Sequence, residues 1–211
     1  MLWQAKRQGL DWPEPAEAPT WRLPRVEPGK QGGNPFNALR PQMQTMEPWS
    51  SRPAAEATQV YEAALRLNPG DAYSLSRLGF LKFQTGHAAE VADLQARAQR
   101  LCPQEFLIIR NGHFFAGMAE FHLGHDDAAY ERMKMTLVIR PTWGFAWQWM
   151  AAIDALAGRP ESAATNLAQF RRYIPNQTIS SLRATEMSRN ETFWVEENRF
   201  YEGLRKAGLP E

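Results

Sequence analysis

The amino-acid sequence predicts an all-α fold in which helical hairpins stack side by side as a solenoid. Two observations lead to this prediction. Glycine, alanine and proline recur at matching intervals, and the repeat length is about 34 residues, as in solenoids built from helix pairs. Between these markers, apolar residues recur three and four positions apart, which is the spacing of a helix with one buried face.

The repeat is clearest in the two hairpins that end at Pro141 and Pro175. In each of them an alanine follows the turn glycine by five residues, and a proline follows the alanine by twelve. Similar markers predict an earlier hairpin that ends at Pro103 and a half repeat that ends at Pro69. The predicted units are residues 54–69, 72–103, 108–141 and 142–175.

Small residues mark the turns and the close contacts of these hairpins. Glycine adopts a left-handed turn conformation at little cost, and a small residue inside a helix lets a second helix approach closely. The structural repeat positions are Gly79, Gly86, Ala98, Gly117, Gly124, Ala129, Gly158 and Ala163. Asp71 is placed to cap one helix, and Pro160 suits the first position of another.

The segment between Pro103 and Pro141 is irregular. Its length is 38 residues rather than 34, so we expect the helix there to begin about one turn early. Asn111 and Gly112 could instead form a turn, since this dipeptide is common in turns. Both interpretations remain open from the sequence.

The two ends of the chain differ from the repeats. Residues 1–53 are rich in proline and glycine, which predicts a largely irregular arm, and residues 54–211 are predicted to form the helical domain. Four tryptophans in the arm either dock on the solenoid or form a linear partner-binding motif. After Pro175, two capping helices are expected within residues 178–207, and the second has Phe193 and Phe200 on one stripe. Gly208 is expected to end this helix.

Composition excludes several classes of function. The net charge is +1 and the pI is about 7.9, so there is no electrostatic footprint for nucleic acid or for an anionic membrane. Cys102 is the one cysteine, which excludes an internal disulfide and suits a cytoplasmic protein. No stretch approaches the roughly 20 apolar residues of a membrane span.

No motif for catalysis or for a cofactor is found. The spacing of the histidines His113, His122 and His125 and of the neighbouring Asp126 and Asp127 does not match a zinc site, and we expect no metal and no cofactor. The two aspartates are better explained as partners of a helix N-terminus. No glycine-rich phosphate loop is present.

The periodic residues resemble those of tetratricopeptide repeat proteins, over roughly residues 54–211. Three stretches, 114–124, 153–163 and 202–211, also resemble the C-terminal tetratricopeptide region of bacterial class III adenylate/guanylate cyclases and of winged-helix transcriptional regulators. In such proteins a separate head carries the activity, and this sequence contains no recognisable head. The resemblance therefore implies a regulatory module without an enzyme activity of its own.

The same resemblance assigns a binding groove to the first helix of each hairpin. The implied groove residues are Tyr73, Phe80, Phe83, Asn111, Phe114, Met118, Phe121, His122, Phe145 and Gln148. They are mostly aromatic and apolar, which disfavours a clamp for an anionic chain end. An apolar helix or extended segment fits such a groove better.

The leading hypothesis is a non-catalytic protein-interaction module that binds a peptide or helix in this groove, or that self-associates through exposed repeat faces. The alternative is the detached regulatory part of a nucleotide cyclase or of a winged-helix regulator. The groove could also be filled by the last helix or by the N-terminal arm, since exposed apolar patches are rare on soluble monomers. The sequence does not identify the partner.

Overall fold

The computed structural model describes residues 54–186 and 188–211, so the predicted arm, residues 1–53, lies outside the described residues. The all-α prediction is confirmed for the described part, which consists of helices and their connections. The α-helices are α3 (Ala54–Leu67), α4 (Ala72–Gln84), α5 (Val91–Leu101), α6 (Phe106–His122), α7 (Asp126–Ile139), α8 (Gly144–Leu156), α9 (Pro160–Tyr173), α10 (Ile179–Ala184) and α11 (Glu191–Lys206), with a 3-10 turn η1 (Ala88–Glu90) before α5.

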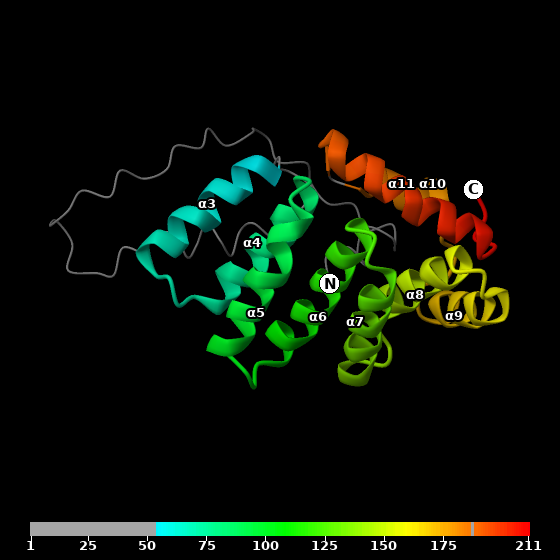
Figure 1. Cartoon of the computed structure of the whole chain (residues 1–211), viewed down its shortest axis with the longest axis horizontal. Coiled ribbons are helices and arrows are strands. Elements are labelled where there is room, and N and C mark those ends of the chain that lie inside the picture. Colours follow the sequence, from blue (N-terminus) through cyan, green and yellow to red (C-terminus); the bar gives the residue numbers. More distant parts are fainter. Residues whose placement is uncertain (1–53, 187) are drawn as a thin grey trace, which may run out of the picture. The chain divides into compact units, whose positions relative to one another are not determined.

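Three antiparallel hairpins form the body of this domain. They are the pairs α4–α5, α6–α7 and α8–α9, and α3 packs on α4 at the N-terminal end of the array (Figure 1). Each second helix also contacts the first helix of the next hairpin, as α5 does with α6. We call the surface formed by the first helices, α4, α6 and α8, the inner face.

Local sequence signals explain where the helices begin and turn. The Asp71 carboxylate caps α4 by accepting a hydrogen bond from the backbone N–H of Ser74 at 2.9 Å. Pro160 occupies the first turn of α9. The turns within the hairpins contain Gly86, Gly124 and Gly158, whose φ angles are 77°, 79° and 70°. Such φ angles are costly for residues with a Cβ, so these turns need glycine.

The helix that follows the irregular segment starts early, as one of the two interpretations predicted. α6 begins at Phe106, and Asn111 and Gly112 lie inside it rather than in a turn. Glycine is tolerated there because a neighbouring helix uses the space: a Cβ on Gly112 would overlap the side-chain amide of Gln99. The Gln99 amide in turn donates to the Ile109 carbonyl at 3.3 Å. The contact between α5 and α6 thus compensates for the poor helix propensity of this dipeptide.

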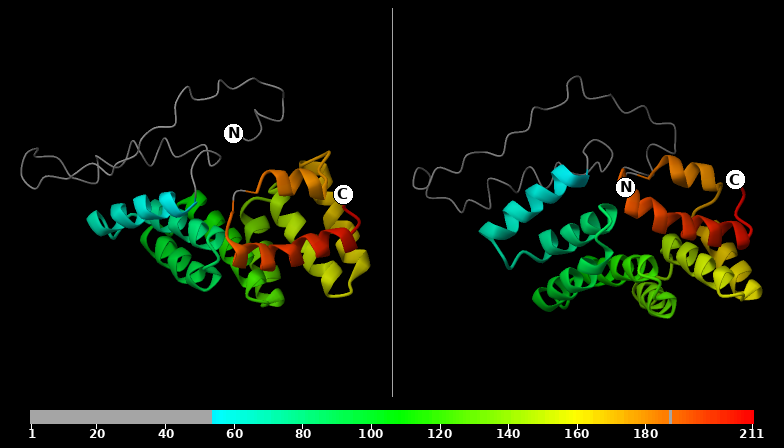
Figure 2. Two further views of the ribbon diagram at one scale, coloured as in Figure 1. Left: turned by 90° about the horizontal axis from the view of Figure 1, so that it is seen from above. Right: turned by 45° about the horizontal axis from the view of Figure 1, so that its top comes forward.

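The two C-terminal helices differ in length and in contacts. α10 is only six residues long, and its N-cap Thr178 and Ser181 form a reciprocal capping box. α11 contacts α8 and α6 on the inner face, which agrees with the alternative that the last helix fills part of the predicted groove (Figures 1 and 2). The segment after α11 folds back, since the backbone N–H of Ile179 donates to the Pro210 carbonyl at 2.8 Å.

One apolar core joins the hairpins to the last helix. Phe193, Phe200 and Leu204 of α11 are each no more than 4% exposed and belong to the same buried cluster as residues of α6 and α8. α11 approaches α8 closely at Gly203, where a Cβ would lie 2.7 Å from the Ala152 carbonyl oxygen. In the part of the chain that the structure describes, no helix is long and apolar enough to span a membrane.

The close contact between α11 and α8 predicts the effect of replacing Gly203 by alanine. A helix without neighbours is more stable with alanine than with glycine at an interior position, by about 0.5–1 kcal/mol. Here the new methyl group would meet the backbone of α8, so we expect a net destabilisation of about 1–3 kcal/mol. Urea unfolding followed by circular dichroism measures the change.

Glu202→Ala is the matched control, because Glu202 lies on the exposed side of the same turn. Its effect should remain below about 0.5 kcal/mol, the scale of a surface ion pair such as the one that Glu202 forms with Lys206. Unchanged or increased stability of the Gly203→Ala variant would contradict the described seating of α11.

Candidate functional site

The inner face is the candidate site, and the structure divides its predicted groove residues into two groups. Phe83, Phe121 and His122 contact α11, and each is no more than 8% exposed. The other predicted groove residues are Tyr73, Phe80, Asn111, Phe114, Met118, Phe145 and Gln148. Among these, the aromatic rings of Tyr73, Phe80 and Phe145 are partly exposed.

Aromatic rings seat α11 on the inner face. Phe200 stacks on Trp149 of α8 with ring centroids 4.0 Å apart. Phe193 meets Phe83 edge to face at 5.2 Å. Such aromatic pairs add about 0.5–1.5 kcal/mol to the gain from burial alone. The amphipathic helix α11 thus packs on Phe83, which was assigned to the groove from the sequence, and on Trp149, which was not.

A buried polar group lies among these rings. The Nε2 atom of His122 is 2.8 Å from Oε2 of Glu197, and both side chains are almost fully buried. The Nδ1 atom of His122 is 2.9 Å from Oε2 of Glu196, without the angle of a hydrogen bond. His122 and Glu197 are 75 residues apart in the chain, so this contact fixes α11 on α6.

Burial sets the protonation of this pair. It lowers the pKa of His122 to about 4, against the opposing effect of the Glu196 carboxylate. It also raises the pKa of Glu197 well above the ordinary value of 4.5, with a smaller contribution from the charge of Glu186. Burial thus disfavours the charged form of both side chains of this pair.

Further polar contacts hold the middle of α11 and the segment before it. Arg199 forms an ion pair with Asp126 and donates to the Phe121 carbonyl at 3.3 Å. The Ser188 hydroxyl donates to the Gln84 carbonyl at 2.6 Å, which ties the segment before α11 to the end of α4. These contacts place α11 across the C-terminal ends of α4 and α6.

A second feature lies near the N-terminal ends of α6 and α8. We call it the aromatic–arginine cluster, and it consists of Arg110, Asn111, Phe114, Arg140, Trp143 and Phe145. The guanidinium carbons of Arg110 and Arg140 lie 4.3 Å and 5.0 Å from the centroid of the Trp143 ring. Asn111, Phe114 and Phe145 were predicted from the sequence. Arg110, Arg140 and Trp143 were missed, although a single charge at the end of the apolar run 106–109 is an available signal.

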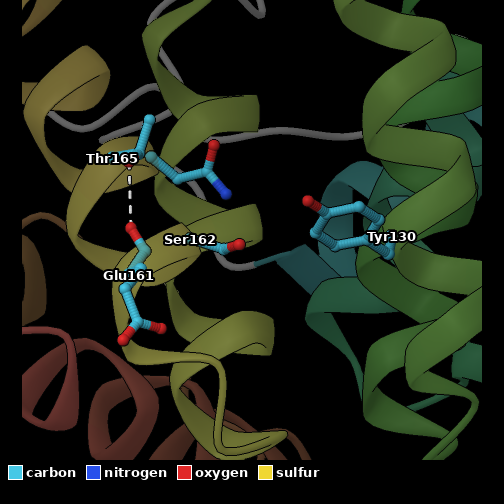
Figure 3. A pocket seen from close by; sticks show the side chains of 5 residues that line it. Tyr130, Glu161, Ser162 and Thr165 are labelled. Carbon is cyan, nitrogen blue, oxygen red and sulfur yellow. Dashed lines mark hydrogen bonds between the residues drawn. The ribbon is translucent and has the colours of Figure 1, made fainter.

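Polar side chains between α8 and α9 are paired with one another. A shallow pocket between α7 and α9 is lined by Tyr130, Glu161, Ser162, Thr165 and Asn166 (Figure 3). The Asn166 amide is already engaged, since it donates to the buried Asp154 at 2.7 Å. Arg159 donates to the same carboxylate at 2.7 Å. The buried carboxylate of Asp154 is therefore already paired within the protein.

The histidines do not converge on a metal site. Within residues 54–186 and 188–211, no group of three or more histidine, cysteine, aspartate or glutamate side chains is arranged to hold a metal ion. His125 pairs with Glu120 at 2.8 Å, while His122 is engaged by α11. Cys102 is partly exposed at the end of α5.

Comparison with known proteins supports the fold. No protein-family model matches the chain, and no curated protein matches it in sequence. A solved structure of MamA RS-1, the ArsTM double mutant, has a TM-score of 0.55 at 13% identity, over 83% of this chain and 98% of that chain. A crystal structure of MamA has a TM-score of 0.50 at 13% identity, over 82% of this chain and 91% of that chain. A mutant of the O-GlcNAc transferase of Thermobaculum terrenum has a TM-score of 0.55 at 18% identity, over 65% of this chain but 26% of that chain.

At these identities the likeness concerns the fold alone. It supports a tetratricopeptide-type helical fold for this chain. It does not support the finer resemblance to the C-terminal regions of nucleotide cyclases and winged-helix regulators.

The raised pKa of Glu197 predicts that the stability of the protein depends on pH. Because the pKa of Glu197 is raised in the folded state, its contribution to stability is fully present below about pH 4.5 and is lost as the pH rises through the folded pKa. Glu197→Gln keeps a hydrogen-bond donor without the titration. We therefore expect the stability of Glu197→Gln to rise relative to the wild type as the pH rises above about 4.5 toward the folded pKa, by up to about 1.4 kcal/mol per pH unit.

Urea unfolding of both proteins at several pH values measures this difference. Glu191→Gln, at the exposed start of α11, controls for the loss of one carboxylate. If the free energies of unfolding of the wild type and of Glu197→Gln differ by the same amount at every pH, the pKa of Glu197 is not raised in the folded protein.

Proposed function

We propose that this chain is a non-catalytic protein-interaction module whose inner face binds a helix or an extended segment of a partner protein. The observation that carries the proposal is the position of α11. The inner face already accepts one amphipathic helix, through the stack of Phe200 on Trp149 and the edge contact of Phe193 with Phe83. A groove that accepts an apolar helix face in this way is a common mode of peptide recognition.

The proposed partner site is the part of the inner face next to these contacts. It contains the partly exposed rings of Tyr73, Phe80 and Phe145, on the first helices of all three hairpins. Phe80 is central in this region, because its ring lies 4.8 Å from that of Phe115 on α6 and 6.5 Å from that of Phe83. Aromatic residues in such positions supply much of the energy of protein interfaces.

Replacement of Phe80 tests the proposed surface. Peptides are selected from a displayed library of random 16-residue sequences on the immobilised full-length chain, and their dissociation constants are measured by fluorescence anisotropy. Phe80→Gln should weaken the selected peptides by about tenfold or more, because an aromatic contact is removed. Phe121 is unsuitable for this test, since it is 1% exposed and a polar substitution there would disturb the core.

Val138→Gln is the matched control. Val138 is 74% exposed on α7, which is a second helix, so the same polar side chain should leave peptide binding unchanged there. Circular dichroism establishes that both variants are folded. Failure to select any peptide, or equal binding of the peptides to both variants, would refute the inner face as the site.

The proposal also predicts that the chain alone has no nucleotide cyclase activity. Incubation of the purified chain with ATP or GTP and a divalent cation, followed by mass spectrometry, should give no cyclic nucleotide above a boiled control. Production that depends on the chain and on time would overturn the non-catalytic assignment. It would then favour the alternative of a cyclase component.

A further inference from the structure

The aromatic–arginine cluster contains a buried guanidinium group. Arg110 is 8% exposed, and its Nε and Nη2 atoms donate to Oδ1 of Asn111 at 3.2 Å and 2.7 Å. One face of the group lies against Trp143. Both contacts fix the orientation of the Arg110 side chain without neutralising its charge.

Arg110 has no carboxylate partner in the part of the chain that the structure describes. Arg140, which lies over the same indole ring, has none there either. Arginine carries five N–H donors, and Asn111 accepts from two of those of Arg110. The indole Nε1 of Trp143 is also buried without an acceptor among the described residues. Arg110 and Arg140 therefore place N–H donors without an acceptor among the described residues beside one ring, that of Trp143.

The electrostatics of the cluster favour an anion. The pKa of Arg110 is lowered to about 10, first by burial and then by the positive charges of Arg140 and Arg77. Arg110 still remains protonated at neutral pH. Its poorly solvated guanidinium group therefore has two further positive charges near it, those of Arg140 and Arg77. Burying a charge is costly unless an opposite charge compensates it.

The surroundings of the cluster indicate what kind of anion fits. The rings of Phe114 and Phe145 lie 5.9 Å and 5.7 Å from that of Trp143, so the site adjoins apolar surface. The helix that already occupies the inner face combines apolar and acidic residues: α11 presents Phe193 and Phe200 together with the carboxyl group of Glu196, which lies 2.9 Å from His122. The net charge of +1 argues against nucleic acid as the anion.

We propose that Arg110 and Arg140 bind aspartate or glutamate side chains of a partner segment whose apolar residues lie on the neighbouring aromatic rings. This inference rests on the proposed function and adds the chemistry of the partner to it. Arginine pairs well with carboxylates, since two parallel N–H groups can donate to the two oxygens. Trp143 and Asn111 would hold Arg110 in place for this contact.

The library selection described above tests the inference with defined probes. Peptides that bind the wild-type chain should be enriched in aspartate and glutamate next to apolar residues. The double variant Arg110→Gln/Arg140→Gln should weaken them by about tenfold or more. The control Arg97→Gln/Arg100→Gln removes the same charge from exposed positions of α5 and should have little effect.

A double-mutant cycle separates direct pairing from a structural role of the arginines. Each selected peptide is also synthesised with its aspartates and glutamates replaced by asparagine and glutamine. If the arginines bind these carboxylates, the loss on Arg110→Gln/Arg140→Gln should largely disappear for the amide peptide. Arg140→Gln alone, at an exposed position, keeps the cycle measurable if the double variant does not fold.

The outcomes distinguish this inference from the proposed function. Peptides that are weakened by Phe80→Gln, but that lack acidic enrichment or show no coupling to the arginines, would overturn the inference and leave the proposed function standing. Failure to select peptides, or selection of peptides insensitive to Phe80→Gln, would overturn both. Acidic enrichment together with coupling would establish the carboxylate contact.

Discussion

The seating of α11 on α8 and α6 organises the described part of this chain. The inner faces of these two helices are lined by large apolar side chains, among them Phe121 and Trp149, which would otherwise face water. Phe200 covers both rings, and Gly203 lets the backbones come close enough for this contact. Burial of one such side chain contributes roughly 1.5–3 kcal/mol, so a few of them are comparable to the net stability of a domain. The last helix is therefore part of the core rather than an appendage.

The polar contact inside this interface explains why α11 has one position. Apolar stripes tolerate small shifts, because one ring can replace another at modest cost. Glu197 tolerates none, since a rotation by one residue would move its buried carboxyl group away from His122 and onto apolar side chains. An unpartnered buried polar group costs about 1–3 kcal/mol. The His122–Glu197 hydrogen bond thus selects the register that the aromatic contacts stabilise.

Local features of the fold could be predicted from the sequence, and long-range ones could not. The Asp71 cap, the turn glycines and the ends of α11 follow from backbone preferences and amphipathic spacing, which act within a few residues. The stripe of Phe193 and Phe200 shows that α11 must be covered, but not by which surface. Its return to the inner face depends on contacts with residues more than forty positions earlier. A tertiary contact likewise explains why Asn111 and Gly112 are helical, because the Gln99 side chain fills the space beside the helix there.

The resemblance to tetratricopeptide repeats assigns the apolar part of the candidate site, because it places Phe80, Phe114 and Phe145 at groove positions of the three hairpins. Arg110 and Trp143 carry no such period, and their meeting depends on how α6 packs beside the start of α8. Arg140, at the end of α7, joins them for the same reason. A charge that looks solvated in the sequence is thereby buried, and only the three-dimensional structure reveals that its counter-charge is missing among the described residues.

The two ends of the inner face are connected through a chain of rings. Phe80 contacts Phe115 at the proposed partner site and Phe83 toward α11, and Phe83 in turn contacts Phe193 of that helix. The contacts of α11 with Phe83 help to hold Phe80 in this position. A partner that needs this position of Phe80 therefore binds better to the form of the protein in which α11 lies on the inner face. By linkage, the partner then stabilises the seated helix by the same free energy with which the seated helix favours the partner. The resident helix and the proposed partner segment would therefore support one another on this face, because they occupy different parts of the groove and share the rings between them.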